Sequence, residues 1–473
     1  MINDKNHFLL GSRTAARLYE SIAELPVYDI HTHVNLGAIL RNEPAVDPWT
    51  ALCQGDHYVS SIIESLGAMS RIEWYDPRTT PERKWKAYAD VFPLLIGNQV
   101  HDWMRMTLDE LGIKMSFNAG NATKIWDQLL ETFQDSRWSP ANIFKNSHIR
   151  LMGTTDNPVD SLDAIKRSVE FFPKGYWIPA WRPDPFLILN PDPLAGKTWL
   201  DWIRDLEKTM GADLAGHWAE FCAALKARHD FFAELGCTVS DYGIRIPYGH
   251  EVSEKRAKSI FNKASGGQAV LPDEASDFQA FMMRFSLDLD FEKEWISQIH
   301  FGAVRNMRDI AEQYGGIDSG CDTTGGCAEV AISLRPLLNR FDRSPEKLQR
   351  ILLYTLDKSD WTRIAGLSRI FPRVYSGMSW WYFDSVSGML EFLETVPDMG
   401  AGFAKIGPFV TDARNIFSLK PRTDLFRRCL ANVLASMVDM RQNGFSETAE
   451  LASFLCSDLP RRWIGGKSAT KPL

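Results

Sequence analysis

The sequence predicts an α/β protein, a (β/α)8 TIM-type barrel with a large helical insertion after the first strand. Three observations lead to this fold. Eight short segments rich in β-branched and aromatic residues recur along the 473 residues, with longer helical stretches between them. Nearly continuous apolar segments that alternate with helices indicate a parallel sheet covered on both faces. An open doubly wound sheet would also need a glycine-rich phosphate turn after its first strand, and the sequence has none there.

Composition sets the broad class of the protein. The chain has 53 Lys and Arg against 60 Asp and Glu, a formal charge of −7, with 45% hydrophobic and 24% charged residues. This balance predicts a globular protein with a large core and argues against a nucleic-acid partner. No apolar stretch approaches the roughly 18 to 20 residues of a membrane helix, so no membrane partner is expected. Seven scattered cysteines without CxxC pairs suit a reducing compartment, and we predict a cytoplasmic protein.

Helical and strand-like segments divide the chain into three parts. An N-terminal amphipathic helix and the first strand occupy 1–34, a helical insertion that could roof the site occupies 35–147, and the rest of the barrel occupies 148–473. The apolar spacing of 424–441 predicts the last barrel helix. The predicted strands lie at 25–33, 148–156, 175–184, 236–241, 295–302, 351–357, 373–381 and 403–414.

The first predicted strand ends in the strongest candidate for chemistry. Side chains alternate along a strand, so His31 and His33 share the barrel-facing side, with Asp29 below them. Two imidazoles at this spacing are suitable ligands for Zn²⁺ or a similar divalent ion. The alternative is a pair of hydrogen-bonded structural histidines, which the eight-strand context disfavours because barrel active sites form at the C-terminal strand ends.

The eighth predicted strand closes the barrel beside the first. It ends in Asp412 and Arg414, so Asp412 can reach a metal held by the two histidines or act as a base beside it. An Asp–Arg pair that caps the following helix is the alternative. The nearby basic cluster of Arg422, Arg427 and Arg428 is predicted to be the solvated face of one helix.

Other polar and aromatic groups follow the remaining strands. His300 is a further candidate ligand or hydrogen-bond donor, and Arg305 and Arg182 suit anionic groups. The Trp380-Trp381 pair could stack on a sugar ring, although most tryptophans in this chain are expected in the core. A structural histidine and a solvated arginine are the alternatives for His300 and Arg305.

Taken together, the motifs resemble those of the uronate isomerases, the glucuronate isomerase family of the amidohydrolase superfamily. The resemblance covers nearly the whole chain, in order. The matching motifs are 28–33 (YDIHTH), 55–58 (GDHY), 153–158 (GTTDNP), 181–184 (WRPD), 236–237 with 240–241 (GC and SD), 298–306 (QIHFGAVRN), 380–381 (WW), and 411–414 (TDAR) with 426–428 (FRR).

The resemblance implies a metal-assisted aldose–ketose isomerase that interconverts D-glucuronate with D-fructuronate and D-galacturonate with D-tagaturonate. It implies one divalent metal ion, expected to be Zn²⁺, and a small-molecule hexuronate as partner, and it allows a homo-oligomer. Metal ligands would be His31, His33 and Asp412. The implied catalytic residues are Asp412, Arg414, His300 and Tyr58, and the implied substrate-binding residues are Arg182, Trp381, Arg305, His57 and Asp241.

The sequence also departs from the family pattern, which predicts an altered shell around the sugar. The differing positions are Ser60, Ser61, Glu64, Tyr242, Ala413 and Phe383. Two other functions therefore stay open. One is a single-metal hydrolase of the same superfamily that acts on a sugar acid or lactone, with Asp412 activating water. The other is a non-catalytic relative that binds sugar acids, which the presence of all three candidate ligands disfavours.

Overall fold

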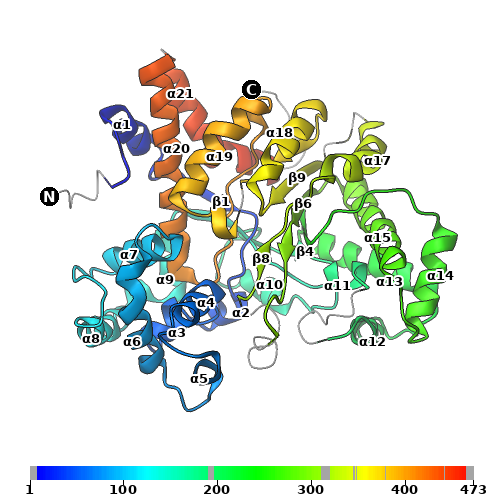
Figure 1. Cartoon of the computed structure of the whole chain (residues 1–473), viewed down its shortest axis with the longest axis horizontal. Coiled ribbons are helices and arrows are strands. Elements are labelled where there is room, and N and C mark those ends of the chain that lie inside the picture. Colours follow the sequence, from blue (N-terminus) through cyan, green and yellow to red (C-terminus); the bar gives the residue numbers. More distant parts are fainter. Residues whose placement is uncertain are drawn as a thin grey trace.

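The computed structural model of the chain describes residues 8–189, 197–309, 320–344, 347, 349–378, 380–441 and 443–464. Parallel strands lie at the centre of the molecule, and helices surround them (Figure 1). The strands are β1 (Val27–Asp29), β2 (Ile149–Gly153), β3 (Trp177–Ile178), β4 (Ala180–Trp181), β5 (Val239–Ile244), β6 (Ile296–Phe301), β7 (Ala303–Val304), β8 (Thr323–Thr324), β9 (Arg350–Thr355) and β10 (Val374–Ser376).

Two parallel sheets form most of a barrel. Their strand orders are β1-β2-β3 and β10-β9-β6-β5-β4, and β7 and β8 form a separate antiparallel pair. An isolated bridge between Asp156 and Trp181 joins the two sheets, and the Asp156 amide donates to Ala180 O over 3.1 Å. Because β3 and β4 are separated by one residue, they act together as the third strand of the barrel.

The eighth predicted strand, 403–414, is not a regular strand. Residues Phe403–Lys405 form the 3-10 helix η6, and Pro408 lacks the N–H that a strand ladder needs. The segment nevertheless lies between β10 and β1. The Gly407 amide donates to Ser376 O over 2.9 Å, and the His33 amide donates to Ala413 O over 2.9 Å. The segment therefore completes a TIM-barrel-like ring, and the predicted fold class is confirmed.

Helices fill the chain between β1 and β2, as the sequence predicts. Asn35, Asp47, Asp56, Ser70 and Thr80 each cap one of them by accepting a backbone N–H, which is why so many short helices begin cleanly here. The division of the chain at 34 and 147 stays a prediction. The helices are α2 (Leu36–Arg41), α3 (Pro48–Leu52), α4 (His57–Ser65), α5 (Arg71–Tyr75), α6 (Pro81–Val91), η2 (Phe92–Leu95), α7 (Gln99–Glu110), α8 (Ala122–Phe133), η3 (Ser136–Trp138) and α9 (Pro140–Asn146).

Helices also precede the first strand and follow the others, where they cover the outside of the barrel (Figure 1). These are α1 (Arg13–Ile22), α10 (Asp163–Ser168), α11 (Asp184–Leu187), α12 (Trp199–Met210), α13 (Trp218–Glu234), α14 (Glu254–Ser265), α15 (Pro272–Lys293), α17 (Val330–Asp342), η4 (Lys358–Asp360), α18 (Trp361–Ile370), η5 (Trp381–Phe383), α19 (Val386–Met399), η7 (Ile416–Ser418), α20 (Leu419–Arg441), α21 (Phe445–Ser453), η8 (Phe454–Asp458) and α22 (Leu459–Ile464).

Helix α20 includes the predicted last barrel helix, but the prediction for its arginines is wrong. Arg422, Arg427 and Arg428 are 1%, 5% and 6% exposed, because α20 packs against α1 and α19 rather than facing solvent. Their charges are satisfied inside the protein. Arg427, for example, donates to the carbonyl oxygens of Ala23 and Leu25 over 2.5 and 2.7 Å.

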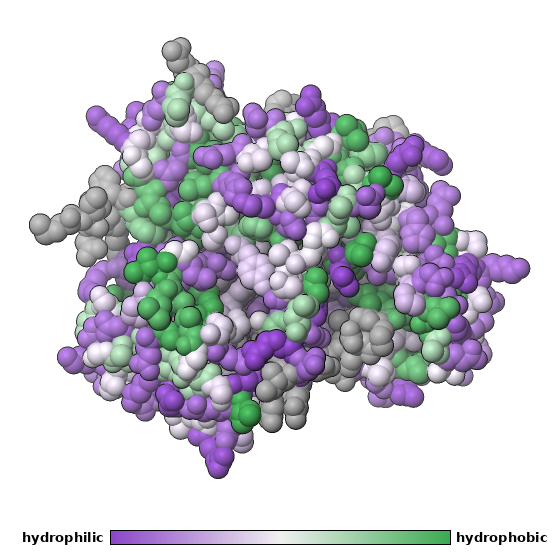
Figure 2. Space-filling model, viewed as in Figure 1, coloured by the Kyte–Doolittle hydropathy of each residue, from purple (hydrophilic) through white to green (hydrophobic). Residues whose placement is uncertain are grey.

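The surface is mixed in character. On the face shown in Figure 2, hydrophilic side chains are interspersed with smaller hydrophobic areas. The most exposed large apolar side chains of the helical region between β1 and β2 are Val46 and, at the end of η2, Leu94 and Ile96. Within the described part of the chain, no helix is both long and apolar enough to cross a membrane.

Candidate metal centre and active site

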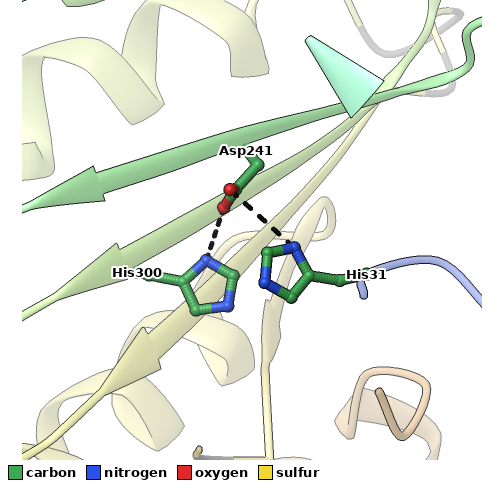
Figure 3. A group of neighbouring side chains, drawn as sticks. All are labelled: His31, Asp241 and His300. Carbon is green, nitrogen blue, oxygen red and sulfur yellow. Dashed lines mark hydrogen bonds and ion pairs between the residues drawn. The ribbon is translucent and has the colours of Figure 1, made fainter. Parts of the chain in front are cut away.

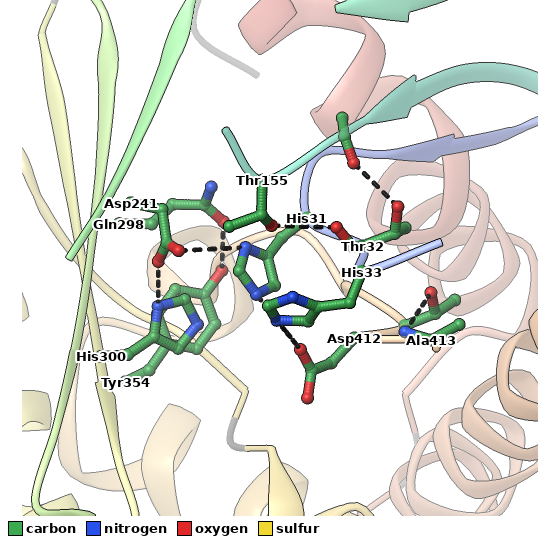
Figure 4. A network of polar contacts seen from close by, with 12 residues as sticks. His31, Thr32, His33, Thr155, Asp241, Gln298, His300, Tyr354, Asp412 and Ala413 are labelled. Carbon is green, nitrogen blue, oxygen red and sulfur yellow. Dashed lines mark hydrogen bonds and ion pairs between the residues drawn. The ribbon is translucent and has the colours of Figure 1, made fainter. Parts of the chain in front are cut away.

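The end of β1 and the eighth barrel segment bring the three predicted metal ligands together. The Nε2 atoms of His31 and His33 lie 3.2 and 3.0 Å from the same Asp412 oxygen, Oδ1 (Figure 4). All three residues offer a ligand atom within 4.8 Å of the others. His31 and Asp412 are buried, whereas the His33 side chain keeps 23% of its surface exposed, so one side of the group is open.

The pKa shifts of His33 and Asp412 suit metal binding, whereas burial lowers the pKa of His31 but the Asp241 and Asp412 carboxylates raise it above its usual value. Burial lowers the pKa of His33 to about 4, which keeps its imidazole neutral at neutral pH. Burial alone would raise the pKa of Asp412, but the neighbouring His33 and His31 hold it well below its usual value. Two imidazole nitrogens and one carboxylate oxygen are a donor set that binds divalent metal ions, so these residues fit such an ion.

A second group shares His31 through its other ring nitrogen. Asp241, on β5, lies between His31 and His300, which follows on β6 (Figure 3). Its Oδ1 is 2.7 Å from His300 Nδ1, and its Oδ2 is 3.8 Å from His31 Nδ1. A carboxylate behind a ligand histidine orients the imidazole and raises its basicity. The arrangement favours the His31, His33 and Asp412 group as the metal centre, with Asp241 supporting it.

Asp241, a predicted substrate-binding residue, has no exposed surface in the structure and lies against His31 and His300. Its charge is balanced by Arg182, whose NH1 lies 2.9 Å from Asp241 Oδ2. Arg182 Nε also donates to Asp184 over 2.9 Å. This approach depends on Gly243, since a Cβ there would lie 2.2 Å from Arg182 NH2. Two carboxylates thus hold Arg182 at the site, and the missing side chain of Gly243 leaves room for its guanidinium.

His300 is held by aromatic rings as well as by Asp241. Its ring stacks on Tyr354 at 4.3 Å between centroids and meets the edge of Trp380 at 4.6 Å. Its Nε2 atom is buried and has no hydrogen-bond partner among the described residues. With Nδ1 engaged by Asp241, Nε2 is the atom that could contact a metal or a substrate oxygen.

Helix α4 brings His57 and Tyr58 to the mouth of the barrel. Asp56 caps this helix by accepting the Tyr58 amide over 3.1 Å. The His57 and Tyr58 rings stack at 4.7 Å, and each contacts Trp381, at 5.7 and 6.3 Å. The buried Tyr58 hydroxyl has no hydrogen-bond partner among the described residues. Trp381 has a φ of 57°, a conformation uncommon for residues other than glycine, which turns the chain at this point.

Two predicted arginines complete the site. Arg305 NH1 pairs with Asp322 at 3.0 Å, and its guanidinium lies 4.9 Å from the Trp381 ring centre. Arg414 is half-buried at the end of the eighth segment. Burial raises the pKa of Asp56 and Tyr58, and the charge of Arg414 is among those that counter this effect. The structure therefore brings all of the predicted site residues to one end of the barrel.

Most of the family departures lie outside this group. Tyr242 points out of the barrel, where its hydroxyl donates to Asp290 over 2.9 Å. Ala413 has no exposed surface, and Phe383 packs against Trp361 at 5.0 Å. Of these three residues only Tyr242 lies on a strand, whereas Ala413 belongs to the irregular eighth segment and Phe383 to η5.

The departures on α4 also have local explanations. The Ser60 and Ser61 hydroxyls donate to backbone carbonyls three residues earlier, over 3.1 and 3.2 Å. Glu64 pairs with Arg71 at 2.6 Å and with Arg308 at 2.9 Å. The predicted change in the shell around the sugar stays a prediction.

Comparison with known proteins shows the family of this chain. The described fold and donor set define a TIM-barrel protein with a candidate metal centre at its C-terminal mouth. The family model for glucuronate isomerases matches residues 2–460. A uronate isomerase of Thermotoga sp. (strain RQ2) is 32% identical over 458 residues, covering 96% of this chain and 98% of that protein. The Bacteroides fragilis uronate isomerase is 30% identical over 455 residues and covers 94% of both chains.

Solved structures give the same result. The uronate isomerase of Thermotoga maritima has a TM-score of 0.91 at 31% identity, covering 98% of this chain and all of that chain. The glucuronate isomerase of Caulobacter crescentus has a TM-score of 0.90 at 27% identity, with coverage of 100% and 99%. The chain belongs to the glucuronate isomerase family, an enzyme family of the isomerase class.

Proposed function

We propose that this chain interconverts hexuronic acids with their keto forms, D-glucuronate with D-fructuronate and D-galacturonate with D-tagaturonate. The observation that carries the proposal is the convergence of His31, His33 and Asp412 in a chain of the glucuronate isomerase family. This arrangement supports proton transfer between two adjacent sugar carbons. The reaction needs a base, groups that stabilise a developing oxyanion, and cations for the substrate carboxylate.

We assign His31, His33 and Asp412 as the residues that hold one divalent metal ion. Zn²⁺ is the expected ion, since it favours imidazole nitrogen and carboxylate oxygen in sites with an open position. When bound, the ion would supply a Lewis acid for the oxygens of the sugar. The open side at His33 is where those oxygens would approach, because His33 is the most exposed of the three side chains.

Asp412 would also move the proton. Its carboxylate, beside the exposed face of His33, would take the C2 proton of the open-chain aldose. The C–H electron pair then forms the C1–C2 double bond of an enediol as O1 gains a proton. Return of the proton to C1, with loss of the O2 proton, gives the ketose. His300 Nε2 and the Tyr58 hydroxyl, both buried without a partner among the described residues, are placed to exchange protons with these oxygens.

The remaining predicted residues would bind the uronate. Arg182 and Arg414 carry charges near the ligand group and would attract anionic oxygens. Trp381, together with His57, offers an aromatic surface at the mouth, and Arg305 lies beside it. We assign Asp241 as the residue that fixes His31, His300 and Arg182 in place.

Turnover of the two sugars tests the proposal. Purified, metal-analysed protein is incubated with D-glucuronate and with D-galacturonate, and the products are identified by proton NMR. Ketose formation supports the isomerase. Hydrolysis of a sugar lactone by metal-loaded protein, without any ketose from either uronate, would favour the hydrolase alternative instead.

We also expect the enzyme to act in the cytoplasm. All seven cysteines are free thiols in the structure, the state that a reducing compartment maintains. The homo-oligomer implied by the sequence resemblance stays a prediction, to be checked by light scattering of the purified protein.

A further inference from the structure

Asp412 has an unusual backbone conformation for a residue at the centre of a site. Its φ is 48°, in the left-handed region that residues with a Cβ seldom adopt. Such a conformation persists only where the surrounding structure holds it. The neighbouring peptide groups therefore indicate what directs the Asp412 carboxylate toward the two histidines.

On one side, Asp29 joins the eighth segment to the first strand. The Thr411 hydroxyl donates to Asp29 Oδ2 over 2.5 Å, and the Thr411 amide approaches both carboxylate oxygens at 3.3 Å. The His31 amide donates to Asp29 Oδ1 over 3.3 Å. Asp29 and Thr411 are each 1% exposed. The buried Asp29 carboxylate thus contacts both the backbone of His31 and Thr411, the residue that precedes Asp412.

On the other side, Arg422 holds the same peptide group. Its NH1 donates to Thr411 O and to Asp384 Oδ2, each over 2.9 Å. The guanidinium carbon lies 3.6 Å from the ring centre of Trp103, and Arg422 is 1% exposed. The Thr411 carbonyl belongs to the peptide bond that leads into Asp412, so this contact restrains the left-handed turn directly.

We propose that Asp29, Thr411 and Arg422 are positioning residues that hold Asp412 in its left-handed conformation and so assemble the metal centre. The inference rests on the proposed function, because it takes His31, His33 and Asp412 as the metal ligands. These three residues act through the backbone next to Asp412 and are not among the assigned metal ligands or substrate-binding residues. Partners that orient metal ligands in this way typically change metal affinity by about 10- to 100-fold when they are replaced.

The test compares Zn²⁺ affinity among full-length variants. Thr411→Val removes the hydroxyl but keeps the side-chain volume, and Thr411→Ser is the matched control that keeps the hydroxyl. Zn²⁺ dissociation constants are measured by competition with a chromophoric chelator, and unfolding temperatures are measured on the metal-free proteins. We expect Thr411→Val to weaken Zn²⁺ binding about 10- to 100-fold, with Thr411→Ser close to the natural chain.

Arg422→Lys tests the opposite side and carries the test alone if Thr411→Val does not fold. Lysine keeps the charge but lacks the planar guanidinium that packs on Trp103 and so directs NH1 to both Thr411 O and Asp384, so weaker Zn²⁺ binding is again expected. Unchanged Zn²⁺ affinity in both variants, even with lower unfolding temperatures, would show a purely structural role and overturn the proposal. A natural chain that binds no Zn²⁺ would instead contradict the proposed function, and the positioning role with it.

Discussion

His33 Nε2 lies 3.0 Å from Asp412 Oδ1, although the two residues come from opposite ends of the chain. The contact exists because the first and eighth barrel segments are neighbours, joined by the backbone bond from His33 N to Ala413 O. Barrel closure therefore creates the candidate metal centre, and it places Asp412 where it can serve both as ligand and as base.

Replacement of Asp412 by Asn tests that double role. Asparagine keeps the shape of the side chain but cannot accept the C2 proton, so we expect turnover to fall by at least about 10³-fold. Ketose formation is followed by NMR, and circular dichroism checks that the variant is folded. Substantial remaining activity in a folded, metal-loaded Asp412→Asn protein would contradict the assignment of Asp412 as the base.

The Tyr58 hydroxyl is the second target. Tyr58→Phe removes a buried hydroxyl that has no partner among the described residues, so stability should be unchanged or slightly higher. We expect kcat to fall about 10²-fold, in the range of a lost catalytic hydrogen-bond donor. Tyr88→Phe is the matched control, because the Tyr88 hydroxyl is also buried without a described partner but belongs to α6, and its ring contacts Phe92 and Phe117. Equal losses in both variants would argue against a catalytic role for Tyr58.

The close approach of Arg182 to Gly243 makes a prediction about substrate binding. In Gly243→Ala, the new Cβ would displace the guanidinium, and we expect KM for the uronate to rise about 10- to 100-fold, the effect of roughly 1.5–3 kcal/mol from a lost charged hydrogen bond. Gly366→Ala, in α18, is the control, since a Cβ there meets no atom within 4 Å. An unchanged KM in Gly243→Ala would remove Arg182 from the set of substrate-binding residues.

Asp156 predicts a dependence of stability on pH. Burial raises its pKa to about 6, whereas the unfolded chain ionises near the usual value of about 3.9. The folded state therefore binds this proton more tightly, and its contribution to stability is present below about pH 4 and lost as the pH rises through 6. Between these pH values, the free energy of unfolding of Asp156→Asn should therefore fall less than that of the natural chain. The difference between the two falls is at most about 3 kcal/mol. Identical pH profiles of thermal unfolding for the two proteins would contradict this prediction.

The sequence predicts the barrel well because strand and helix periodicity is a local property. The sequence also predicts that His31, His33 and Asp412 lie together. Side-chain alternation puts the two histidines on one face, and strand order brings Asp412 beside them. The family resemblance supplies His57 and Tyr58, which come from the helical region between the first two strands. The regular strand predicted at 403–414 is absent because Pro408 and the left-handed Asp412 interrupt the ladder.

Long-range contacts of buried charges are harder to predict. Arg422 has the sequence environment of a solvated helix face, yet it is buried between Thr411, Asp384 and Trp103. Asp241 lies on a strand of the barrel, and His31, His300 and Arg182 surround its carboxylate. Neither result follows from local pattern, because both depend on side chains that approach from other elements.

Isomerisation in deuterated water, by protein of known metal content, tests the proposed metal-assisted isomerase function most directly. D-Glucuronate and D-galacturonate are incubated with metal-loaded and with chelator-treated protein, and proton NMR follows the ketose and deuterium at C1. We expect ketose formation only with metal, and we expect added Zn²⁺ to restore it to the chelator-treated protein. Deuterium should enter at C1 to the extent that the transferred proton exchanges with solvent. Full turnover by metal-free protein, or no ketose from either sugar by metal-loaded protein, would contradict the proposed function.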